Sequence, residues 1–471
     1  MGLEHAGTTR IVTSAWSLLR RRGRRSGLFS GPLLRRLARF DIAFERARGL
    51  LAPGRYEASA RFGGADYLTV AGFAAAGAVI ALATQAALDA EVSRHWNIYF
   101  HADPNRVLVD MTERTSEQWR TGVHPIFPLL TYPLMHALIA LVGDRIAAGE
   151  ILTAACAGAC AGCYYLALRG LGLPLAAACA FAAVLLGSAT FVHWFAIVET
   201  YPFAAVSVTI MLLVLTAVSA RVKGAWVGAS ALLLAITVTN WALALACAFF
   251  RLRLSAFVVT SIAAFALVAA LALVQGAVFP NAHLFFRPYV YLQELGVTRV
   301  ALAEEGITAW GPGDSLRSFA FASVVAPPPY VEEVQTVVGP FTLVNNQASR
   351  IASLPPLGAA LSALWLLLLT GGAVEACRLK RLRPVALPVG AYVLFQAVLH
   401  VFYGEITFLY AGNYFPALVM IAAFNWFAPW RWIAVTAALL LAVVGGGYNF
   451  VQFLAAAEAA NVIAAAAQSA P

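Results

Sequence analysis

The stretch from Ser255 to Val278 reads SAFVVTSIAAFALVAALALVQGAV and contains no charged residue. It is longer than the roughly 20 apolar residues that a helix needs to cross the hydrocarbon core of a bilayer. Arg251 and Arg253 precede it, and an excess of arginine marks the cytoplasmic side of a membrane segment. This segment therefore predicts a membrane helix that starts inside and ends outside.

The composition of the 471-residue chain extends this prediction to the whole protein. Hydrophobic residues make up 61% of the chain and charged residues 12%, whereas a soluble domain carries about 25% charged residues. These values exclude a soluble enzyme, a disordered chain and a nucleic-acid-binding module. The net charge of +9 comes mostly from arginine and indicates cytoplasmic loops, not a nucleic-acid partner. We expect an all-α polytopic membrane protein.

The N-terminal segment, residues 1–66, is rich in arginine and has neither a long apolar run nor a small-residue cleavage site. It is typical of a basic cytoplasmic segment that rests on anionic lipid. The first crossing, Tyr67–Ala90, then runs outward, so the polar stretch Glu91–Val123 lies outside. We expect one transmembrane domain over residues 67–450, with external loops at 91–150 and 279–353 and an external C-terminal tail at 451–471.

About eleven crossings follow from the apolar segments and the positions of arginine and lysine. Six free cysteines lie in or beside these segments, so no disulfide framework is predicted, and three of them on one face indicate close helix packing. The crossings are Tyr67–Ala90, Ile151–Leu168, Leu173–Phe191, Tyr201–Ala220, two short helices in Gly224–Phe250 broken near Thr239-Asn240, Ser255–Val278, Leu357–Ala376, Val385–Phe402, Ala411–Phe427 and Ile433–Tyr448.

The segment His124–Val142 is the ambiguous one. It is short and contains Pro125, Pro128 and Pro133, which disfavour a continuous spanning helix. We expect it at the outer surface, because counting it as a crossing would put basic residues outside and Glu199 inside. The loop 279–353 is too long to be a simple connector, and we expect either an external subdomain or lid, or a passive loop.

Ionisable residues next to the spans are the candidates for function, and the predicted topology puts three groups of them on the outer side. The first group is Asp103, Arg106 and Asp110, where Asp103 also fits the cap of a helix starting at Pro104. The others are His124, which could equally anchor a helix at the interface, and Glu199 at the outer end of a helix, where a solvated acid is the simpler alternative.

These motifs resemble those of the GT-C glycosyltransferases, the multi-span enzymes that take a sugar from a polyprenyl-phosphate carrier. The resemblance is to the branch of the protein mannosyltransferases and the lipid A aminoarabinose transferase. Asp103-Pro-Asn-Arg106 stands where that branch has an acidic motif after its first span, and His124-Pro125 stands where it has a basic residue and a proline. The later motifs Val198-Glu-Thr-Tyr-Pro202, Val238-Thr-Asn-Trp241 and Gly412-Asn-Tyr-Phe-Pro416 follow in the family's order.

The resemblance implies an enzyme that transfers a sugar from a polyprenyl-phosphate donor to a lipid, glycan or protein acceptor. It implies Asp103 and Glu199 as the catalytic acids, which would activate the acceptor or bind a divalent metal ion, magnesium or manganese. Binding of the donor phosphate falls to Arg106, His124 or Arg287, because a departing phosphate needs cations. The remaining residues implied in substrate binding are Asp110, Tyr201, Asn413 and Tyr414.

The alternative function is a transporter or flippase of a lipid-linked sugar without transferase activity. A transporter needs a site near the bilayer midplane, and the middle of the predicted spans is nearly free of acids and bases. A composition rich in alanine, leucine and arginine with two lysines favours a bacterial cell envelope protein in the cytoplasmic membrane, with its site on the outer face.

Overall fold

The computed structural model describes residues 62–95, 97–304, 311–336, 339–347, 354–404 and 406–469. Helices make up 78% of the structure, and one antiparallel hairpin joins β1 (Tyr330–Thr336) to β2 (Gly339–Asn345). Most of the basic segment 1–66 lies outside the described residues. The predicted all-α class is confirmed for the bundle, and the hairpin is an addition to it.

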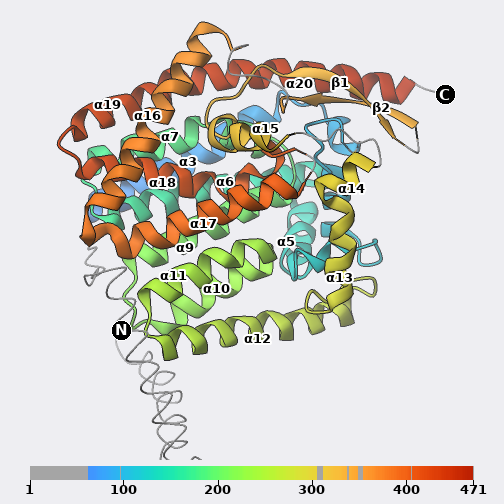
Figure 1. Ribbon diagram of the computed structural model, residues 1–471. Helices are drawn as coiled ribbons and strands as arrows, with labels where there is room; N and C mark the ends of the chain where they lie inside the picture. The colour runs from blue at the N-terminus through green and yellow to red at the C-terminus, as the bar shows by residue number, and fades with distance from the viewer. Residues whose placement is uncertain are drawn as a thin grey trace, which may run out of the picture.

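Seven helices in the described part of the chain are long and apolar enough to cross a bilayer. The protein is therefore a multi-pass membrane protein. In Figure 1, α12 and α20 run along opposite sides of the bundle. The seven are α3 (Gly64–Gln85), α6 (Arg145–Leu171), α9 (Thr200–Ala217), α12 (Leu254–Val278), α16 (Pro356–Arg378), η7 with α17 (Lys380–Phe402), and α19, η10 and α20 together (Arg431–Gln468).

Shorter apolar helices occupy the other four of the eleven expected crossings. They are α7 (Leu175–Gly187), α10 (Lys223–Ile236), α11 (Trp241–Arg251) and α18 (Phe415–Ala423). Each is too short to cross alone, so the number of crossings beyond seven stays a prediction. The expected break near Thr239-Asn240 is confirmed, because α10 ends at Ile236 and the short helix η3 (Val238–Asn240) separates it from α11.

Helices α3 and α6 pack closely because glycines line their contact. A side-chain carbon at Gly77 would lie 2.8 Å from the Ala157 carbonyl oxygen, and one at Gly158 would lie 2.8 Å from the Ala74 carbonyl oxygen. At one end of the pair, Arg169 Nε lies 2.6 Å from Asp66 Oδ1. The small residues and this ion pair fix the first span against the second.

The segment His124–Val142 forms α5 (Phe127–Val142), a helix with Pro133 in its interior. Its length is below that of a spanning helix, as the prolines predicted. In Figure 1, α5, α13 and α14 stand crosswise to α12 near one of its ends. The predicted juxtamembrane position of α5 agrees with this arrangement.

The loop 279–353 folds back over the segment that follows the first span. Phe100 N–H donates to the Val344 carbonyl oxygen at 3.0 Å, and Val344 N–H donates to the Ile98 carbonyl oxygen at 2.8 Å. The loop is thus attached to the bundle where the structure describes it. Its elements are α13 (Pro288–Gln293), η4 (Glu294–Val297), α14 (Arg299–Glu304), α15 (Pro312–Arg317), the π-helical turn η5 (Ser318–Ala322), β1 and β2.

The expected C-terminal tail, residues 451–471, is not an unstructured tail in the described part. Helix α20 spans Gly446–Ser469 and continues the last span. Its apolar face is buried at Phe453, Ala456 and Ala460. The alanine-rich sequence favours helix, and this buried face holds it against the bundle. The short elements that remain are η1 (Val92–Arg94), α4 (Pro104–Thr112), η2 (Trp119–Gly122), α8 (Ala189–Trp194), η8 (Phe408–Asn413) and η9 (Phe424–Phe427).

Candidate functional site

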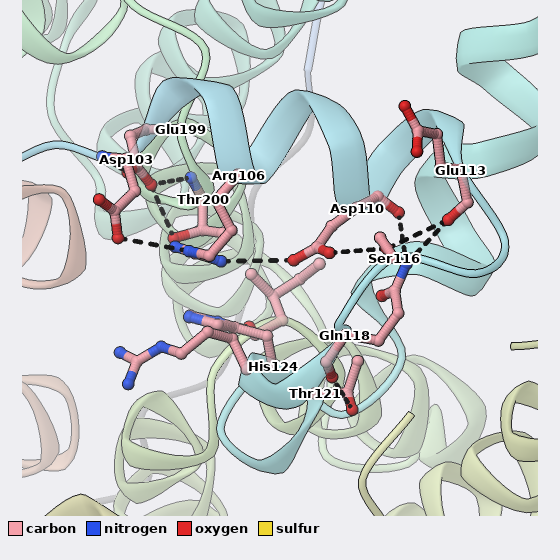
Figure 2. Close-up of polar contacts among 12 residues, drawn as sticks. Asp103, Arg106, Asp110, Glu113, Ser116, Gln118, Thr121, His124, Glu199 and Thr200 are labelled. Carbon is pink, nitrogen blue, oxygen red and sulfur yellow. Dashed lines mark hydrogen bonds and ion pairs between the residues drawn. The ribbon is translucent and has the colours of Figure 1, made fainter. Parts of the chain in front are cut away.

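Asp103 stands immediately before α4, where the sequence placed it, but its side chain does not cap the helix. Its backbone N–H donates to Glu199 Oε1 at 2.8 Å, and its carboxylate Oδ2 lies 3.3 Å from Arg106 Nε. Figure 2 shows these contacts at the start of α4. The Asp103 side chain is 33% exposed. The carboxylate is therefore held in place by its neighbours and still accessible to a ligand.

Glu199 connects the N-terminal ends of two helices. Its Oε1 accepts from Asp103 at the start of α4, and its Oε2 accepts the Thr200 N–H at 2.7 Å at the start of α9. Its side chain is buried. Burial raises the pKa of Glu199, the Asp103 charge raises it further, and the Arg106 charge opposes both. The expectation that Asp103 and Glu199 share one site is met by a direct hydrogen bond.

Arg106 lies between two carboxylates on α4. Its Nε faces Asp103, and its Nη1 lies 3.4 Å from Asp110 Oδ2. Asp110 is buried and accepts the Ser116 hydroxyl at 2.9 Å, and burial raises the pKa of its carboxyl group. One arginine thus serves three acids, Asp103, Asp110 and, through space, Glu199, so the site carries an excess of negative charge when all three are ionised.

His124 lies near this network but is not the cation that the sequence predicted. Its Nδ1 donates to the Ile236 carbonyl oxygen at 2.7 Å, which joins the start of α5 to the end of α10. Burial and the nearby Arg120 charge lower the pKa of His124 to about 3. The imidazole is neutral at physiological pH, and the prediction of a phosphate-binding cation here is wrong for this physical reason.

A second charged cluster, which the sequence did not indicate, surrounds Arg120. Its Nη1 lies 3.2 Å from both carboxylate oxygens of Glu294, the Tyr403 hydroxyl donates to Glu294, and the guanidinium lies over the Trp119 ring. Arg120 is 15% exposed and Glu294 13%. Arg120 and Glu294 are 174 residues apart in the chain, so no local pattern pairs them.

Tyr201 lies between the two clusters. It follows Glu199 in the first turn of α9, and its ring lies edge-on to Tyr410 with centroids 5.8 Å apart. The Tyr410 ring in turn lies 6.0 Å from the Tyr403 ring, which belongs to the Arg120 cluster. Tyr201 is therefore near the site, as the sequence predicted, and it is buried.

The structure does not bring the other predicted substrate-binding residues to Asp103. Arg287 is exposed before α13 and forms no ion pair within the described residues. Asn413 is buried and accepts a hydrogen bond from the Asn240 amide at 2.9 Å, while the buried Tyr414 ring stacks on Phe319 at 3.9 Å. Asn413 and Tyr414 therefore hold the bundle together around the helix break.

The carboxylates at this site do not fit a divalent metal ion. Both Glu199 oxygens are occupied by backbone N–H donors, and a guanidinium stands against Asp103. Hard cations need several free oxygen ligands at once. Among the described residues, no group of three His, Cys, Asp or Glu side chains is placed to hold a metal.

Comparison of the chain with known protein families, curated proteins and solved structures finds no match. The resemblance to the GT-C glycosyltransferases therefore depends on the motifs quoted above and on the contacts between them. Two of those motifs, at Asp103 and Glu199, meet in space, and another two, at Asn240 and Asn413, meet elsewhere in the bundle.

Proposed function

We propose that the protein is a glycosyltransferase of the GT-C type, which moves a sugar from a polyprenyl-phosphate donor to a lipid, glycan or protein acceptor on the outer face of the cytoplasmic membrane. The observation that carries the proposal is the 2.8 Å hydrogen bond from Asp103 to Glu199. It joins two motifs that lie 96 residues apart and leaves one accessible carboxylate beside an arginine.

The chemistry assigned to Asp103 is general-base catalysis. Its carboxylate takes the proton of the acceptor hydroxyl while the acceptor oxygen forms a bond to the anomeric carbon of the sugar. The bond from that carbon to the phosphate oxygen breaks, and the polyprenyl phosphate leaves with the electron pair. A positioned base contributes on the order of 10²–10⁴-fold to such a rate.

Glu199 and Arg106 are positioning residues in this mechanism. Glu199 fixes the backbone at Asp103, and the Arg106 guanidinium orients the Asp103 carboxylate. Arg106 is 22% exposed, so its outer edge can also meet the negative charge that develops on the leaving phosphate. With His124 neutral, Arg106 is the cation nearest to the proposed base among those that the sequence predicted.

The polyprenyl tail of the donor requires an apolar surface that faces lipid. Helix α12, which precedes the loop 279–353, exposes Leu273 and Val274 near its end. Helix α16, which follows the loop, exposes Leu357 at its start. The proposal places the tail along these helices, where burial of its methylene groups against protein and lipid costs nothing.

The experiment that tests the proposal is the Asp103→Asn variant of the full-length protein. The substitution keeps the size of the side chain and removes its charge and basicity. We expect transfer from a polyprenyl-phosphate sugar to fall by about 10²–10⁴-fold, while the melting temperature and the affinity for the donor lipid are retained. Turnover is measured with a radiolabelled sugar on the donor.

Glu117→Gln is the matched control for this variant. Glu117 lies in the same external segment, is exposed, and has no ion pair or side-chain hydrogen bond in the described structure, so its loss of charge should leave transfer unchanged. Near-normal turnover of Asp103→Asn would show that Asp103 is not the base. Movement of an intact lipid-linked sugar across the membrane without transfer would favour the flippase alternative.

A further inference from the structure

A partly open cavity of about 310 Å³ lies outside the Asp103 site. It lies between the turn η5, the chain that follows β2, and helix α16. Pockets for small ligands have volumes of roughly 300–1,000 Å³, so this one has room for a single small unit. The residues that line it include Arg317, Ser318, Phe321, Asn346, Gln347 and Ser362.

Several polar side chains in this cavity are buried without a partner. Asn346 is 3% exposed, and neither its Oδ1 nor its Nδ2 has a hydrogen-bond partner in the structure as described. The hydroxyl groups of Ser318 and Ser362 are in the same position. Buried polar groups in folded proteins are almost always hydrogen-bonded, so three orphaned groups around one cavity indicate a ligand that satisfies them.

The charge in the cavity is balanced without a ligand. Arg317 Nη2 lies 2.8 Å from Asp314 Oδ1, and the same nitrogen donates to the Gln347 carbonyl oxygen at 3.1 Å. The guanidinium therefore needs no external anion. The unpartnered groups are neutral and offer both donors and acceptors, which suits hydroxyl groups better than a phosphate or a carboxylate.

The rest of the lining is apolar. Phe321, Val325 and Leu354 share the cavity with Asn346. A sugar ring combines a rim of hydroxyl groups, each able to donate and accept, with faces of C–H groups that pack on apolar side chains. We propose that this cavity binds one neutral monosaccharide unit, with its hydroxyl groups on Asn346, Ser318 and Ser362.

The cavity is connected to the Asp103 region through the same loop. Strand β2 contacts residues 98–100, shortly before Asp103, and the chain reaches Asn346 at the end of that strand. The sugar bound there is a unit of the acceptor glycan. This last assignment rests on the proposed function, whereas binding of the sugar does not.

Binding is tested with the full-length protein in phosphatidylcholine nanodiscs, because common detergents carry sugars themselves. The probes are the methyl glycosides of mannose, galactose, glucose and arabinose, followed by saturation-transfer NMR. We expect saturation of the ring protons of at least one glycoside, a signal at least fivefold weaker in Asn346→Leu and weaker in Ser362→Ala, and an unchanged signal in Asp103→Asn. The proposal is overturned if no glycoside binds, if Asn346→Leu binds equally well, or if inorganic phosphate displaces the glycoside.

Gln347→Leu controls for effects on folding. The Gln347 side chain accepts from Thr407 N–H at 3.1 Å and donates to the Thr407 hydroxyl at 3.4 Å, so its loss should lower the melting temperature. Asn346→Leu removes an amide without a partner and should not lower it. An equal decrease in both variants would make Asn346 a structural residue and overturn the proposal. Glycoside binding without transfer from any donor would instead refute the proposed function alone.

Discussion

A carboxylate that is buried and accepts two backbone N–H groups, as Glu199 does, has opposing influences on its protonation. The hydrogen bonds from Asp103 and Thr200 favour the ionised form, and burial favours the protonated one. Burial is the larger effect, so the pKa of Glu199 is raised above the ordinary glutamate value of 4.5. Protonation at a higher pH than usual weakens the support of the Asp103 backbone, and transfer should decline as the pH falls through this pKa.

The Glu199→Gln variant tests this dependence. The glutamine oxygen can still accept from Asp103, but its amide group faces the Thr200 N–H, and one hydrogen bond is lost. We expect about a tenfold lower rate at neutral pH, a milder loss than that of Asp103→Asn. Because glutamine does not titrate, the acid limb of the pH–rate profile should move to lower pH. An acid limb at the wild-type position would show that Glu199 does not control it.

The pairing of Asp103 with Glu199 could be anticipated from the sequence, because both residues follow from the order of the motifs and from the side of the membrane. The state of His124 could not, since it depends on burial and on a carbonyl group 112 residues away. The contact between Arg120 and Glu294 depends in the same way on the folding of the loop 279–353 onto the bundle, which no local pattern reveals.

At the level of helices, the sequence predicts apolar spans and their breaks well and predicts pairings poorly. The break between α10 and α11 and the short α5 follow from Asn240 and from the prolines. The hairpin of β1 and β2 was not anticipated, because its stability comes partly from backbone contacts with residues 98–100. The helical C-terminus likewise depends on packing that a segment-by-segment reading does not include.

The contact between α3 and α6 gives a prediction with an internal control. Leucine at Gly77 would push a side chain against the Ala157 carbonyl oxygen, 2.8 Å from the first added carbon, whereas nothing lies within 4 Å of Gly72 on the same helix. Overpacking costs about 1–3 kcal/mol. We expect Gly77→Leu to lower the melting temperature and Gly72→Leu to leave it unchanged. Equal melting temperatures would contradict the close packing of these helices.

The topology of the whole molecule can be tested at the two ends of α9. This helix joins Glu199 to the basic pair Arg221 and Lys223, and it is long and apolar enough to cross the bilayer once. Reporter fusions should place Glu199 outside and Arg221 inside, because basic residues stay on the cytoplasmic side. Fusions that report the opposite sides would put the Asp103 site in the cytoplasm and would require α5 or another short helix to cross.

The central claim is that the sugar reaches the Asp103 site on a lipid carrier, and the most direct measurement offers purified full-length protein two radiolabelled donors. One is a polyprenyl-phosphate sugar, and the other is the corresponding nucleotide sugar without lipid. The proposed function predicts a labelled acceptor product from the lipid-linked donor, no product from the nucleotide sugar, and loss of the product in Asp103→Asn. Turnover of the nucleotide sugar in the absence of any lipid carrier would contradict it.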